Sequence, residues 1–84
     1  MCTILSPAQQ PVQGTTFEVH FQGSPPIRWR WYISDGGGTD KGVSDDADTT
    51  LRIVVPNGTA GLMLTLTIVC SKRCSDTMTW RIDS

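Results

Sequence analysis

Residues 28–38 read RWRWYISDGGG, so tryptophan alternates with arginine before the chain runs into glycine. A helix would spread these side chains around its circumference, whereas a strand would place the indoles on one face and the guanidinium groups on the other. We therefore predict a β-strand whose inner face places Trp29 and Trp31 at the centre of a core. The opposite face would be in water and carry Arg28, Arg30 and Tyr32.

The same two-residue alternation of apolar and polar side chains continues over most of the chain, in segments rich in β-branched and aromatic residues. The breaks between these segments contain glycine, proline and asparagine, which are typical of turns. This pattern predicts an all-β fold, a single antiparallel β-sandwich of six to seven strands in one domain over residues 1–84. The expected strands are 3–5, 15–21, 27–33, 50–55, 62–69 and 77–82.

Length and charge exclude several classes of partner. The chain has 84 residues and a formal net charge of −1 at pH 7, which leaves room for one core and provides no global field that attracts nucleic acid. No apolar run approaches the ~20 residues of a membrane span. We expect neither a nucleic-acid partner nor membrane insertion. The start, MCTILSPAQQ, has no signal-peptide pattern, which favours a mature or excised segment or a virion component.

The three cysteines are an odd number, so at least one is left over. If 62–70 and 74–82 form a hairpin, its three-residue loop places Cys70 opposite Cys74, near the ~3.5–4.5 Å Cβ separation of a disulfide. We predict a Cys70–Cys74 disulfide formed in an oxidising compartment, with Cys2 free for an intermolecular bond. A zinc site of the three cysteines and His20 is a weaker alternative, because the C-x3-C spacing is a weak zinc signal and the histidine is fixed to a different face.

Groups for catalysis are scarce. His20 is the only histidine and lies in the middle of a strand beside Glu18, on a face that we expect to be solvated. No nucleophile elbow or phosphate-binding loop is present, so we predict no enzyme activity and no cofactor. An acidic stretch supplies candidate calcium ligands, but its spacing does not match an EF-hand, and a solvated turn is the favoured interpretation. These weak candidates are Asp45, Asp46 and Asp48.

Two local signals concern the surface. Asn57-Gly58-Thr59 matches the N-glycosylation sequon, which makes Asn57 a candidate glycosylation site, but Asn-Gly is also a common turn signal and the turn needs no further assumption. Glu18 and Arg52 are predicted to lie on adjacent strands of the second sheet as a solvent-facing pair of opposite charge, which would mark the register.

The outward side chains of three expected strands are the most informative set. A flat face of threonine, arginine and one aromatic residue fits a protein or glycan surface, although any solvated sheet carries threonine and arginine. Single-stranded nucleic acid would need exposed stacking aromatics, whereas the tryptophans are expected inside. The predicted binding residues are Arg28, Arg30, Tyr32, Thr65, Thr67, Thr77, Thr79 and Arg81.

The order of these signals resembles the polycystic-kidney-disease (PKD) type of immunoglobulin-like domain. The resemblance rests on GTTFEVHFQGSPPIRWRWYISDGGG (14–38) and GLMLTLTIVCSKRCSDTMTWRI (61–82). Trp29 and Trp31 lie where the family's tryptophan would fall, and Asp35-Gly36 where its Asp-Gly turn would fall. The resemblance implies an extracellular module used for spacing, adhesion or glycan contact.

From this we expect a non-enzymatic structural or adhesive module, packed as a subunit or domain of an extracellular or virion surface assembly. Its partners would be neighbouring copies or other surface subunits, and its location extracellular, at a cell surface or in a virion. The alternative is a carbohydrate-binding module that uses the outer Arg/Tyr/Thr face.

Overall fold

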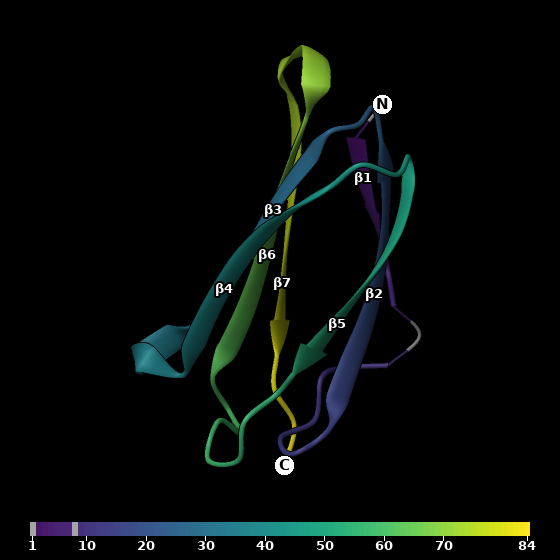
Figure 1. Cartoon of the computed structure of the whole chain (residues 1–84). Helices are drawn as coiled ribbons and strands as arrows, with labels where there is room; N and C mark the ends of the chain where they lie inside the picture. Colours follow the sequence, from purple (N-terminus) through teal and green to yellow (C-terminus); the bar gives the residue numbers. More distant parts are fainter. Residues whose placement is uncertain (1, 8) are drawn as a thin grey trace.

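The computed structural model describes residues 2–7 and 9–84. Its strands form two antiparallel sheets that pack face to face (Figure 1), which confirms the all-β sandwich expected from the alternation. The three-stranded sheet has the order β1 (Cys2–Leu5), β2 (Thr16–Gly23) and β5 (Asp48–Val54). The four-stranded sheet has the order β4 (Gly38–Ser44), β3 (Ile27–Ile33), β6 (Met63–Cys70) and β7 (Cys74–Arg81).

The core lies between the sheets and is built from the inward member of each alternating pair. Phe17 on β2 meets Trp80 on β7 edge to face, with ring centroids 5.1 Å apart and an interplanar angle of 71°. The largest fully buried side chains include Phe21, Ile27, Ile53, Leu64, Leu66, Ile68 and Ile82. Both sheets therefore depend on one apolar interior.

The edge between β1 and β7 is held by hydrogen bonds. The backbone N–H of Ile4 donates to Asp76 Oδ2 at 2.8 Å, so the carboxylate of β7 satisfies a donor of β1. Further along, the segment before β2 forms a parallel bridge between Val12 and Asp83. These contacts fix the N-terminal segment against the end of the four-stranded sheet.

The predicted Cys70–Cys74 disulfide is wrong. Cys2 on β1 is bonded to Cys70 on β6, with the Cα atoms 5.9 Å apart, and Cys74 is the free cysteine. Cys70 and Cys74 do face each other in the hairpin register, as expected. However, β1 pairs with β2 and turns Cys2 inward against the second sheet, so the disulfide joins the two sheets instead of the hairpin tip.

The strand β4 lies in a stretch where the sequence pattern predicted no strand. Gly42 on its inner side leaves room for Trp29 of β3, because a Cβ there would overlap the indole. At Gly38 a Cβ would lie at an ordinary contact distance of 3.6 Å from Trp31. Gly42 therefore admits an aromatic side chain on an edge strand.

The two tryptophans of β3 are not equivalent. Trp31 is buried with 9% of its surface exposed, but Trp29 is only half-buried and packs against the margin of the core. The prediction that both fill the centre of the core is correct for Trp31 and wrong for Trp29. Trp29 lies opposite Gly42 on the edge strand β4, where the interior ends.

Candidate functional site

The outer side of the four-stranded sheet brings together all the residues that the sequence analysis assigned to a binding surface. Residues that pair directly across antiparallel strands project on the same side of the sheet, so the register defines this surface. We call it the cationic face. It comprises Thr39, Lys41 and Val43 of β4, Arg28, Arg30 and Tyr32 of β3, Met63, Thr65, Thr67 and Val69 of β6, and Ser75, Thr77, Thr79 and Arg81 of β7.

The charges of the cationic face have one sign. It carries four of the seven lysines and arginines of the chain, and none of its residues is an aspartate or glutamate. Across residues 2–7 and 9–84, the ion pairs both involve Glu18 on the other sheet, so these four cations have no carboxylate partner. The net charge of the chain is −1, and the positive charge is therefore a local property of this face.

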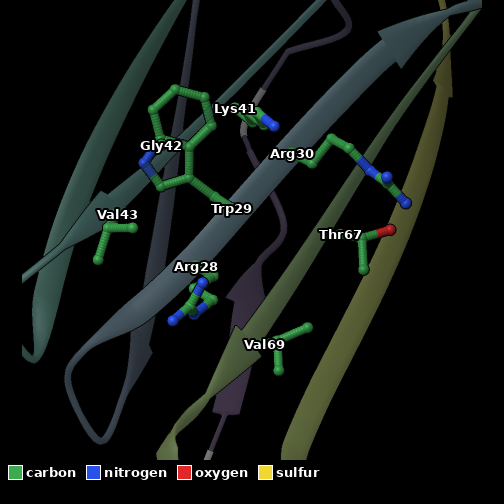
Figure 2. A pocket seen from close by; sticks show the side chains of 8 residues that line it. All are labelled: Arg28, Trp29, Arg30, Lys41, Gly42, Val43, Thr67 and Val69. Carbon is green, nitrogen blue, oxygen red and sulfur yellow. The ribbon is translucent and has the colours of Figure 1, made fainter.

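Three of the cations lie together over β3 and β4. Arg30 is paired directly with Lys41, and Arg28 lies two residues further along β3, about 7 Å away at the usual rise of a strand. They border a hollow of ≈ 460 Å³ shared by β3, β4 and β6 (Figure 2). In Figure 2 the guanidinium group of Arg30 extends from β3 toward Thr67 on β6. The hollow is lined by Arg28, Trp29, Arg30, Lys41, Gly42, Val43, Thr67 and Val69.

Threonine hydroxyls cover the part of the face over β6 and β7. The hydroxyls of Thr65 and Thr79 are 3.1 Å apart, and those of Thr67 and Thr77 are 3.2 Å apart, each within hydrogen-bond distance. Beside this pair of rows lies Tyr32, whose residue surface is 49% exposed. The hydroxyls therefore form an ordered polar platform that continues from the cations.

Polar and apolar residues of the face are arranged in rows across the strands. The row through Arg30 and the row through Tyr32 are polar or aromatic over all four strands. The exposed aliphatic side chains lie in the outer rows, with Val43 and Val69 on either side of Arg28 and Met63 at the opposite end. The face thus has a polar centre and apolar ends.

The outer side of the three-stranded sheet contains the pair predicted from the sequence. Glu18 pairs with Arg52 in register, and Glu18 Oε2 lies 3.2 Å from Arg52 Nε, which confirms the predicted neighbours. His20 Nε2 lies 3.9 Å from Glu18 Oε1, and its Nδ1 is 2.8 Å from the Thr50 hydroxyl. His20 is exposed, as expected, in a solvated network of side chains.

The remaining predicted positions lie away from the cationic face. Asn57 and Gly58 form an exposed turn between β5 and β6, as expected, but this turn connects the two sheets and does not close a hairpin. The acidic residues Asp45, Asp46 and Asp48 are exposed around the connection from β4 to β5. Within residues 2–7 and 9–84, no three His, Cys, Asp or Glu side chains converge as metal ligands would.

Six residues of the cationic face were not predicted from the sequence: Thr39, Lys41 and Val43 on β4, and Met63, Val69 and Ser75 on β6 and β7. The signal for the first three was present, because Thr39, Lys41 and Val43 alternate with small or short side chains. The glycines on either side indicated a turn more strongly than this alternation indicated a strand. Recognising β4 would have placed a third cation beside the two arginines of β3.

Comparisons with known proteins found no matching family model, no matching curated protein and no matching solved structure. Over the part of the chain that the structure describes, no helix is long and apolar enough to cross a membrane.

Proposed function

We propose that the chain is a non-enzymatic adhesive or structural module, and that it holds its partner on the cationic face. One observation carries this proposal: four cations share an exposed sheet face that contains no carboxylate. Leaving like charges together without counter-charges does not help the fold, because like-charge neighbours repel one another. A ligand or partner that neutralises them gives the arrangement a function.

We further propose that the sandwich is immunoglobulin-like and of the PKD type, and that it works outside the cell. In support, β3, β6 and β7 lie side by side as strands C, F and G do in immunoglobulin-like sandwiches, with β1, β2 and β5 in the second sheet. The Cys2–Cys70 disulfide favours an oxidising compartment such as an extracellular or virion surface. Such a module would be a subunit or domain of a surface assembly.

A carbohydrate-binding module is the second candidate, and it would use the same face. The observation that favours it is the platform of threonine hydroxyls beside the exposed ring of Tyr32. Sugars are bound by hydroxyl partners together with an apolar ring surface, and this platform offers both.

Sedimentation velocity over a wide concentration range, paired with a glycan array, tests both candidates. Self-association without ligand that is lost in Arg28→Gln/Arg30→Gln supports packing against neighbouring copies. A monomer that binds glycans through the same arginines supports the second candidate. A monomer with no glycan binding, whose arginine variant behaves like the wild type, contradicts the proposal that this face is a contact surface.

A further inference from the structure

We infer that the cationic face binds an acidic polysaccharide, with Arg28, Arg30 and Lys41 receiving its sulfate or carboxylate groups. This inference rests on the proposed function, in which the cationic face is the contact surface, and it adds the chemistry of the ligand.

The charge of the ligand follows from the three clustered cations. Arg28 and Arg30 are exposed on one strand, and Lys41 lies directly across from Arg30. Guanidinium groups bind sulfate and carboxylate oxygens through paired N–H donors, and such charge-assisted hydrogen bonds are the stronger ones. Because no carboxylate of the described chain occupies these donors, they are free to bind an external anion.

The polar centre of the face distinguishes a polysaccharide from an acidic protein. Protein interfaces have an apolar core surrounded by a polar rim. Here the order is reversed, because the central rows contain Arg30, Thr67 and Tyr32, whereas Val43 and Met63 lie in the outer rows. A hydrated ligand rich in hydroxyl groups fits a polar centre better than the apolar core of a protein interface does.

The scarcity of exposed aromatics argues against single-stranded nucleic acid. Proteins that bind single strands stack successive bases on several aromatic side chains. Tyr32 is the only aromatic residue of the cationic face. The indole of Trp29 borders the hollow but is half-buried against Gly42, and the indole of Trp31 is buried on the other side of the sheet. One ring is sufficient for an apolar contact with a sugar, but it cannot stack a series of bases.

The cations and the threonine platform follow one another across the sheet, which predicts the orientation of a bound polysaccharide chain. From Arg30 the row runs through Thr67 to Thr77, over three neighbouring strands about 4.8 Å apart. Arg81, at the far end of β7, places a further cation beyond the threonines. A ligand with anionic groups separated by sugar hydroxyls would therefore match a threonine platform that has Arg30 and Lys41 at one end and Arg81 at the other.

The experiment is isothermal titration calorimetry of the full chain with three oligosaccharides of equal length. They are a heparin fragment, which carries sulfate and carboxylate groups, a hyaluronan fragment, which carries carboxylate groups alone, and a neutral maltose oligomer. We expect saturable binding of the heparin fragment, weakening as salt is added, and no binding of the neutral oligomer. Binding of hyaluronan as well would identify carboxylate as a sufficient group and supports the inference.

The variant Arg28→Gln/Arg30→Gln should weaken binding at least about tenfold, since two charge-assisted contacts are lost. The matched control is Arg52→Gln/Lys72→Gln, which changes the net charge equally but alters residues outside the cationic face. It should bind within about twofold of the wild type, because the partners on the face are intact. Circular dichroism of both variants shows whether each is folded. If the double arginine variant is unfolded, Lys41→Gln alone serves, with an expected loss of about threefold.

Three results would overturn the inference: no saturable binding of either acidic oligosaccharide, equal losses in the two double variants, or tighter binding of a single-stranded DNA or polyglutamate of equal charge. If the acidic oligosaccharides fail but Arg28→Gln/Arg30→Gln still abolishes self-association, the inference fails and the proposed function stands.

Discussion

The two outer faces of the sandwich are built by the same alternation but carry their charges differently. On the three-stranded sheet, Glu18 lies within 4 Å of both His20 and Arg52, so opposite charges share adjacent positions. On the four-stranded sheet, Arg30 faces Lys41 across the strands, and neither side chain forms an ion pair with a carboxylate of the described residues. On the three-stranded sheet, strand pairing places opposite charges side by side. On the four-stranded sheet, the positive charges must be neutralised by counter-ions or by a ligand.

This difference in charge balance indicates which outer face of the sandwich is the candidate binding site. A solvated face can balance its charges locally at no cost to the fold, as β2 and β5 do. The outer face of the four-stranded sheet does not balance its charges, although the chain has eight acidic and seven basic residues. Those acids lie in loops, at strand ends or on other faces, and the asymmetry is what identifies the candidate site.

Both sheets pack on one hydrophobic core, and the variant Trp31→Ala tests this. Of the variants considered, it should lower the free energy of unfolding the most. The free energy of unfolding should fall by about 3–5 kcal/mol, because a large buried side chain is lost from the shared core. Chemical denaturation followed by fluorescence and by circular dichroism should still show one transition. Tyr32→Ala, one residue along on the cationic face, is the control and should cost far less. Separate unfolding transitions for the two sheets would contradict the claim that they share one core.

The disulfide between the sheets should contribute the next largest effect. Cys2→Ser/Cys70→Ser removes a crosslink between residues 68 positions apart and should lower the free energy of unfolding by about 2–4 kcal/mol. Cys74→Ser is the matched control and should change it little, because that cysteine is free. Peptide mapping under non-reducing conditions that finds Cys70 bonded to Cys74 would contradict the structure at this point.

A smaller loss of stability is expected when the packing of the edge strand β4 against Trp29 of β3 is disturbed. Trp29→Ala should cost about 1–2 kcal/mol, less than Trp31→Ala, since its side chain is only half-buried. Gly42→Ala should destabilise the wild type, because the new methyl group would overlap the indole of Trp29. In the Trp29→Ala background the same change should be nearly neutral, and a double-mutant cycle measures this coupling. Additive effects would show that the indole does not pack on Gly42.

Removing one charge from each face should change the free energy of unfolding least, and in opposite directions on the two faces. At low salt, Glu18→Gln should lower the free energy of unfolding by a few tenths of a kcal/mol, because the attraction to Arg52 is lost. Arg30→Gln should raise it by a similar amount, because repulsion from Arg28 and Lys41 is relieved. Both changes should shrink at high salt as the charges are screened. The same sign for both variants would mean that the faces do not differ in charge balance.

Much of the fold could be predicted from the sequence because strand alternation is a local signal. The inward positions of Phe17 and Trp80 and the outward set from Arg28 to Arg81 follow from a period of two, which requires only that a strand has two faces and that one of them is buried. The pairing of Glu18 with Arg52 was also predicted correctly, but it further requires that β2 and β5 are neighbours in this register.

The errors arose where distant parts of the chain decide the outcome. Cys70 has an adjacent cysteine in its hairpin, yet its bond is to Cys2, which is brought near only when β1 pairs with β2. The strand β4 depends on Gly42, which indicates a turn locally but accommodates Trp29 in the folded chain. Because Lys41 lies on that strand, the full cation cluster was missed when the glycine signal outweighed the alternation of Thr39, Lys41 and Val43.

The most direct test of the central claim is a nuclear magnetic resonance titration of the ¹⁵N-labelled protein with a heparin hexasaccharide. We predict that the chemical-shift changes concentrate at the amides of β3, β4 and β6 and at the side-chain Nε groups of Arg28 and Arg30. The Nε of Arg52, held by Glu18 on the other sheet, should stay unchanged. Shift changes centred on β2 and β5, or no saturable change on either face, would contradict the account.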